Sequence, residues 1–150
     1  MKLAEALNDR ASLNQKLNSL KKRMIQNSKV QEGDEFDENP LELYEEYKNT
    51  LKEHLCLVKR INKTNSSTSI GDQTLEEALL NRENMKSEQK CLKELIDFAT
   101  EKSDRYNRSE IKYVKTVNIS ELQKLTDSLA KKYRELDTKI QQLNWNTDLL

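Results

Sequence analysis

Residues 104–120 read DRYNRSEIKYVKTVNIS, and this stretch differs from the rest of the chain. From Ile111 to Ile119 the pattern has a period of two, which is typical of a strand, whereas almost every other segment repeats with a helical period. The stretch is β-branched and aromatic, and it carries four basic side chains. Because an extended segment needs partners for its backbone groups, we expect it to pair with a strand or to lie on a surface.

Length and composition predict a single helical domain over residues 1–150. Charged and hydrophobic residues each make up 35% of the chain, and there are two glycines and one proline, which is typical of long helices with exposed faces. The 26 basic and 26 acidic residues cancel. No overall charge therefore favours binding to nucleic acid or to an anionic membrane.

Four segments have the apolar periodicity of long helices. Asn39 and Pro40 are typical of a helix start, as are Thr74 with Glu77 and Asn118 with Glu121. The predicted helices run from about Lys2 to Lys29, from Asn39 to about Asn62, from Thr74 to about Lys102, and from Asn118 to about Trp145.

Two of the intervening segments are predicted to be loops. Val30–Asn39 is acidic and contains Gly33, and Asn62–Gln73 is polar and contains Gly71. Because Cys56 and Cys91 are isolated within helical stripes, we expect reduced thiols in the core. The predicted apolar stripe of the second helix consists of Tyr44, Tyr47, Leu51, His54 or Leu55, Val58 and Ile61.

Together these features predict an all-α fold. We expect an elongated up-down bundle of four long, coiled-coil-like helices, with one short β or extended segment between the third and fourth helices. In such a bundle the acidic loop Val30–Asn39 and the basic stretch 104–120 share one end. The loop Asn62–Gln73 lies at the other end with Met1 and the C-terminal tail.

The sequence offers little for enzyme chemistry, and we expect no enzyme activity. His54 is the one histidine, so sites built from several histidines are excluded, and we expect it on the helix seam or the surface. No glycine-rich phosphate loop and no Cys/His zinc spacing occurs. We therefore expect no catalytic residue, no metal and no cofactor.

The basic stretch is the first candidate site, and assembly is its favoured role. Its charge could be met by the acidic loop, within one chain or between subunits, through groups such as Glu38. Alternating Arg and aromatic residues also occur in phosphate and nucleic-acid binders, which is the alternative. The candidate assembly or ligand-binding residues are Arg105, Tyr106, Arg108, Glu110, Lys112, Tyr113 and Val117.

Two further groups are predicted from the helical model. Polar residues interrupt the apolar stripes and form either a register-setting layer in the bundle or a small-ligand site. This polar layer consists of Arg10, Arg82, Gln89 and Asp137. At the other end we expect a loop–tail contact in which the indole covers the bundle end. It consists of Asn62, Asn65, Asn144 and Trp145.

Five blocks carry a resemblance to a known family: VQEG at 30–33, INKTN at 61–65, TLEEALLNRE at 74–83, RYNRSEIKYVKTVNISELQ at 105–123 and YRELDTKIQQLNW at 133–145. In this order they resemble the bacterial septicolysin-like proteins, many of which have no known function. The family's name implies a cytolysin, a pore-forming toxin. It implies no catalytic residue.

These observations favour a non-enzymatic assembly or interaction protein that forms a homo-oligomer, with itself as its main partner. The first alternative is a soluble pore-forming cytolysin, for which a membrane would be the target. The second is a phosphate or nucleic-acid binding module. Because the N-terminus has no apolar signal segment and no window reaches the ~18 apolar residues of a membrane span, we expect a cytoplasmic protein.

Overall fold

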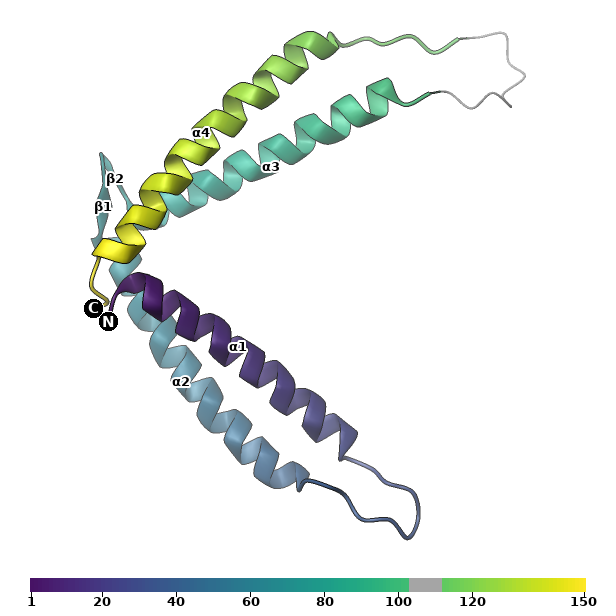
Figure 1. Cartoon of the computed structure of the whole chain (residues 1–150), viewed down its shortest axis with the longest axis vertical. Coiled ribbons are helices and arrows are strands. Elements are labelled where there is room, and N and C mark those ends of the chain that lie inside the picture. Colours follow the sequence, from purple (N-terminus) through teal and green to yellow (C-terminus); the bar gives the residue numbers. More distant parts are fainter. Residues whose placement is uncertain (103–111) are drawn as a thin grey trace. The chain divides into compact units, whose positions relative to one another are not determined.

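A computed structural model of the chain describes residues 1–102 and 112–150. Its four long helices confirm the predicted all-α fold, and a small two-stranded sheet lies between α2 and α3 (Figure 1). The helices are α1 (Leu3–Gln26), α2 (Pro40–Ser67), α3 (Leu75–Thr100) and α4 (Ile119–Asn146), and the strands are β1 (Ser69–Ile70) and β2 (Gln73–Thr74).

The chain divides into two compact units. The first unit contains Met1–Leu75 and Gln141–Leu150, and therefore holds α1, α2 and the sheet. The second unit, Glu76–Ile140, holds nearly all of α3 and most of α4. The single domain expected over residues 1–150 stays a prediction.

Two of the predicted helix caps are confirmed. The Asn39 side chain accepts a hydrogen bond from the Leu41 N–H at 3.0 Å, and Pro40 occupies the first turn of α2. At the start of α4, the Asn118 Oδ1 accepts from the Glu121 N–H at 3.2 Å. Each bond satisfies one of the backbone donors that a helix leaves unpaired in its first turn.

The helices α1 and α2 run antiparallel and pack along one apolar seam (Figure 1). Buried residues recur at intervals of three, seven or eleven, as expected of a helix with one packed stripe. On α1 these include Leu3, Ala6, Leu17 and Leu20, and on α2 they are Leu43, Thr50, Ile61 and Thr64. The half-buried residues Tyr47, His54 and Leu57 complete the stripe on α2.

The stripe predicted for α2 is therefore wrong in part. Tyr47, His54 and Ile61 do lie on the seam, but Tyr44, Leu51 and Leu55 are exposed. Their places are taken by Leu43, Thr50 and Leu57. At 3.6 residues per turn, two apolar stripes run along α2 about a quarter-turn apart, and α1 covers only one of them.

The loop predicted at Asn62–Gln73 is also wrong in part. The helix α2 continues to Ser67, and Ser69–Ile70 then pairs antiparallel with Gln73–Thr74. The two residues between the strands include Gly71, whose φ of 65° lies in the left-handed region that favours glycine in tight hairpins.

The strand predicted between the third and fourth helices is not found in the described residues. Residues 112–116 form neither helix nor strand, and Tyr113 and Val114 are exposed. Nothing in this part of the chain pairs with their backbone in a ladder. The remainder of the expected strand, from Arg105 to Ile111, lies outside the described residues.

The two chain ends meet in the first unit. Leu3 donates to the Thr147 carbonyl at 2.9 Å, and Leu149 donates to the Met1 carbonyl at 3.0 Å. The tail also reaches α2, because the Leu150 N–H donates to the Thr64 Oγ1 at 3.0 Å. Met1, the tail and the end of α2 thus come together, as the sequence predicted for this end of the fold.

Candidate functional site

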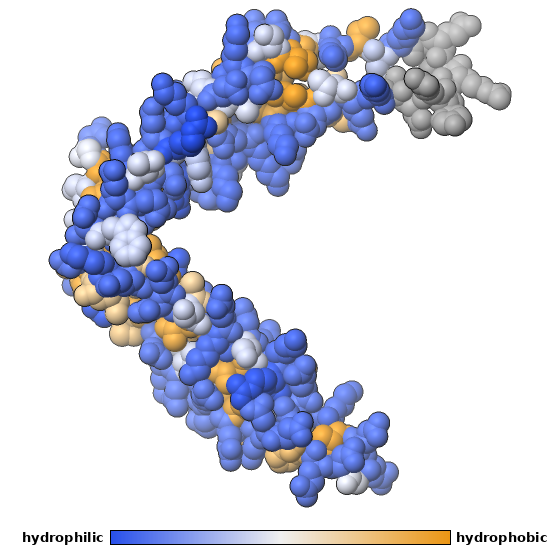
Figure 2. All heavy atoms as spheres, in the orientation of Figure 1, coloured by the Kyte–Doolittle hydropathy of each residue, from blue (hydrophilic) through white to orange (hydrophobic). Residues whose placement is uncertain are grey.

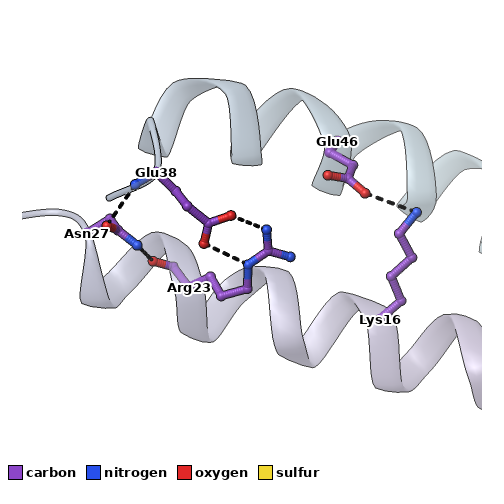
Figure 3. Close-up of polar contacts among 5 residues, drawn as sticks. All are labelled: Lys16, Arg23, Asn27, Glu38 and Glu46. Carbon is purple, nitrogen blue, oxygen red and sulfur yellow. Dashed lines mark hydrogen bonds and ion pairs between the residues drawn. The ribbon is translucent and has the colours of Figure 1, made fainter. Parts of the chain in front are cut away.

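One flank of the α1–α2 seam is held by polar contacts (Figure 3). Two guanidinium nitrogens of Arg23 on α1 donate hydrogen bonds to the Glu38 carboxylate, and the Nε to Oε2 distance is 2.9 Å. The Asn27 side chain accepts from the Glu38 N–H at 3.1 Å and donates to the Arg23 carbonyl at 3.0 Å. The hydrogen bond from Arg23 lowers the pKa of the Glu38 carboxyl. These contacts secure the connection between α1 and α2.

The same flank carries a second ion pair and an open recess. Lys16 Nζ lies 3.1 Å from a Glu46 carboxylate oxygen (Figure 3). The recess has a volume of about 420 Å³, and it is lined by Met1, Asp9, Ser12, Leu13, Glu53, Cys56, Leu57 and Arg60. Arg60 is already engaged, since its Nε donates to the Leu150 carbonyl at 2.9 Å. Within the described ranges, no group of three or more His, Cys, Asp or Glu residues could hold a metal ion.

The prediction that both thiols lie in the core is wrong. Cys56 and Cys91 are free and exposed. Cys56 lies between the seam residues His54 and Leu57, and Cys91 adjoins the half-buried Leu92 on α3. One step along a helix turns a side chain by about 100°, which is enough to move it from the packed stripe to solvent.

The opposite flank of α2 is apolar and uncovered. We call the exposed residues Leu41, Tyr44, Leu51 and Leu55 the outer stripe. Their exposed fractions are 74%, 48%, 44% and 53%. They are spaced by three, four or seven residues, and the half-buried Val58 continues the same row. Along the surface of this pair of helices, apolar patches lie among hydrophilic side chains (Figure 2).

Lys48 occupies the one polar position within the outer stripe. Its Nζ lies 5.2 Å from the centre of the Tyr44 ring and 2.8 Å from a Glu45 carboxylate oxygen. The hydrogen bond to Glu45 raises the pKa of the Lys48 ammonium group. Its charge is therefore held beside the stripe, and its aliphatic stem remains available to pack against apolar groups.

The predicted polar layer is brought together only in the second unit. Arg82 Nη1 lies 2.6 Å from the Asp137 Oδ1, and this ion pair joins α3 to α4. Arg10 and Gln89 are half-buried, and in the part of the chain that the structure describes neither forms an ion pair or a side-chain hydrogen bond. The register-setting role of the layer stays a prediction.

His54 lies on the seam of α2, as expected. Its Nε2 atom is buried and has no hydrogen-bond partner among the described residues. The Lys16–Glu46 ion pair shows which levels of α1 and α2 lie side by side, and in that register Arg10 lies close to the level of His54. This level of the seam is therefore polar on both helices.

The loop–tail contact forms with different residues. The tail is held by Thr64 and Arg60, whereas Asn62 is exposed and Asn65 is half-buried on a helix. The side chain of Asn144 is buried, but Trp145 is 59% exposed, so its expected role in covering the bundle end is wrong. The α4 stripe runs through Leu136, Ile140 and Leu143, and position 145 points away from it.

The basic stretch is described only in part. Lys112 and Tyr113 are exposed and Val117 is half-buried, while Arg105, Tyr106, Arg108 and Glu110 lie outside the described residues. Its expected pairing with the acidic loop stays a prediction for most groups. Glu38, one of the proposed acidic partners, is instead bound to Arg23.

The sequence prediction does not separate the outer stripe from the seam, because it places Tyr44 and Leu51 on the seam and offers Leu55 as an alternative to His54. Counting back from Ile61 in steps of four and three passes through Leu57, His54, Thr50, Tyr47 and Leu43. That series contains the polar residues Thr50 and His54, whereas the neighbouring series is apolar except at Lys48. A search for two parallel stripes would have found both.

The fold and surfaces define an all-α protein with an uncovered apolar helix flank. No helix within the described ranges is long and apolar enough to cross a membrane. The chain belongs to a family of unknown function, DUF6847, whose model matches residues 10–149. It is similar to a crystal structure of a functionally unknown conserved protein from Corynebacterium diphtheriae, with 43% identity, a TM-score of 0.91, and coverage of 100% of this chain and 99% of that one. No curated protein matches.

Proposed function

We propose that this protein is a non-enzymatic, cytoplasmic assembly protein that forms a homo-oligomer. The observation that supports this proposal is the outer stripe of α2, where four large apolar side chains are exposed in one regular row. Isolated exposed apolar residues are normal on a protein surface, but a contiguous row is typical of an interaction site. Full burial of a large apolar side chain contributes roughly 1.5–3 kcal/mol of favourable transfer free energy, and Tyr44, Leu51 and Leu55 are about half exposed, so covering each of them contributes roughly half of that.

The polar surface supports the same function. The 26 basic and 26 acidic residues leave no net charge that would keep copies apart. The carboxylates of Glu38, Glu45 and Asp137 are each engaged with a basic side chain. Because each of these three carboxylates is paired with a basic side chain, we assign it a structural role and no catalytic role.

Solution mass tests the proposal directly. The chain has a mass of 17.6 kDa, so light scattering of the purified protein at micromolar concentration should give a multiple of that value. A mass equal to one chain over the whole micromolar range contradicts the proposal.

The segment that contains Tyr113 and Val114 is a second contact in this proposal. Both side chains are exposed, and residues 112–116 have no ladder partner within the described chain. Replacing Val114 with Pro removes a backbone N–H that pairing with a strand of another copy would need, and Tyr113→Asp introduces a charge. Either variant should lower the solution mass while the helical circular dichroism is kept.

Two assays separate this function from the alternatives. The resemblance to septicolysin-like proteins implies membrane attack, which would release dye from liposomes. A phosphate or nucleic-acid binder would be retained on a heparin resin in a salt-dependent way. Dye release or specific retention, combined with a monomeric mass, would replace the assembly function with one of these.

A further inference from the structure

The outer stripe has a charged border on the side away from α1. Glu45, Lys52 and Lys59 are spaced seven residues apart along α2 and are all exposed. At 3.6 residues per turn, this row lies immediately beside the outer stripe. A partner helix that covers the stripe must therefore lie against this row as well.

Charge is divided unevenly along α2. Residues 40–49 carry Glu42, Glu45 and Glu46 with Lys48, whereas residues 50–67 carry Lys52, Lys59, Arg60 and Lys63 with Glu53. A helix with an acidic first part and a basic remainder complements its own copy when the two run in opposite directions, and it opposes that copy when they run in the same direction.

We propose that two copies of this chain associate through their outer stripes, with the two α2 helices antiparallel about a two-fold axis. This inference rests on the proposed function and names the surface and the geometry of the contact. In a two-fold contact the same patch serves both copies, so the acidic part of each α2 meets the basic part of the partner's α2.

The spacing selects one register. When Leu55 packs on the partner's Tyr44, Lys48 lies at the partner's Leu51, and Leu41 lies at the partner's Val58. Glu45 then lies beside the partner's Lys52, and the symmetry generates a second such pair. The Lys48 stem packs in the interface and its ammonium group stays with Glu45, and a single polar position of this kind sets register in paired helices.

The recess and the ion pairs beside the seam do not overlap the outer stripe. Lys16–Glu46, Arg23–Glu38 and the recess all lie on the other flank of the seam. The contact requires no rearrangement of α1 against α2.

Charge reversal tests the proposal. Glu45→Lys and Lys52→Glu each turn two attractive contacts into two repulsive ones, so each should raise the dimer dissociation constant by about tenfold. A one-to-one mixture of the two variants should restore association, because the lysine introduced in one variant then meets the glutamate introduced in the other. The double variant should likewise regain association relative to either single variant, although Lys48 no longer has Glu45 as its partner.

Matched controls keep this test specific. Glu53→Lys makes the same charge change on the recess flank of α2 and should leave the dissociation constant unchanged. Leu51→Asp should abolish the dimer, whereas Leu80→Asp changes a leucine on α3 that is 67% exposed and should have no effect on it. Circular dichroism confirms that each variant keeps its helices.

The outcomes distinguish the inference from the proposed function. Recovery in the mixture supports the antiparallel contact. An oligomeric wild type whose mass is unchanged in Glu45→Lys, Lys52→Glu and Leu51→Asp overturns the contact and leaves the proposed function standing. A wild type that is monomeric throughout the micromolar range overturns both.

Discussion

Thr64 shows how one side chain can hold the end of the chain in place. It is fully buried on α2, its hydroxyl donates to the Arg60 carbonyl at 2.9 Å, and the same oxygen accepts from the Leu150 N–H at 3.0 Å. This hydrogen bond is part-buried, so a Leu150 N–H that loses its acceptor is only partly solvated by water in its place.

We predict that Thr64→Val lowers the free energy of unfolding by about 1–2 kcal/mol, since valine has the same shape but no acceptor. Urea denaturation measures the change. Thr138→Val is the matched control, because Thr138 is exposed and its hydroxyl bonds only to the Arg134 carbonyl within its own helix. Equal losses in the two variants would show that the tail contact contributes nothing.

Glu38 makes stability depend on pH. Its pKa is lowered in the folded protein by the hydrogen bond from Arg23, and the ionised carboxylate is therefore the form that the fold favours. In the unfolded chain the carboxyl titrates near its ordinary value of about 4.3. The pair thus stabilises the fold above that pH, and this contribution is lost as the pH falls through the lower folded pKa.

We predict that Glu38→Gln lowers the melting temperature at neutral pH and that the difference from wild type shrinks below about pH 4. Melting curves between neutral and acidic pH provide the measurement. The control is Glu135→Gln, whose carboxylate lies 4.0 Å from the Lys131 Nζ on an exposed helix face. A deficit in Glu38→Gln that stays constant down to the most acidic pH would rule out the linkage.

At the scale of elements, the helices of the second unit are joined by a polar pair. Half-buried residues on α3 recur as Ala99, Ile96, Leu92, Gln89 and Met85, and the row continues to Arg82. Arg82 and Asp137 are each about one-third exposed or less, so their pairing is only partly screened by water. Removing one partner leaves a charge that water solvates incompletely.

We predict that Asp137→Ala destabilises the protein by about 1 kcal/mol. The double replacement Arg82→Met with Asp137→Leu should match or exceed the wild-type stability, since apolar groups of similar size can replace a buried ion pair. Urea denaturation of the wild type and these variants gives the comparison. If the double variant is less stable than Asp137→Ala, the pair stabilises the fold more than an apolar contact would.

At the scale of the whole molecule, the two compact units raise the question of cooperativity. Thr64 lies in the first unit, and Asp137 lies in the second. If residues 1–150 form a single domain, the chain unfolds in one transition, and a change in either unit shifts that transition as a whole.

We predict that Thr64→Val and Asp137→Ala each move the same single thermal transition to lower temperature. Circular dichroism and calorimetry follow the melting, and the calorimetric and van't Hoff enthalpies should agree. Two transitions, each sensitive to only one of the variants, would show that the units fold separately.

The amino-acid sequence determined the features that depend on neighbours along the chain. Asn39 with Pro40 and Asn118 mark helix starts because a cap bonds to backbone groups two or three residues away. The all-α fold likewise follows from periodicity within each helix. The same local pattern suggested a strand near Tyr113, but the described residues there have no ladder partner, and a strand requires one.

Only the tertiary structure decided which face of each helix is covered. The α2 sequence contains two apolar rows, and the leucines of α1 cover the row with Thr50 and Thr64, which leaves Tyr44, Leu51 and Leu55 exposed. The helix α2 also continues to Ser67 through a polar run that the sequence predicts to be a loop. Thr64 lies within that run and bonds to the C-terminal tail. Periodicity places residues on a face, but the identity of the buried face depends on a partner that is distant in the sequence.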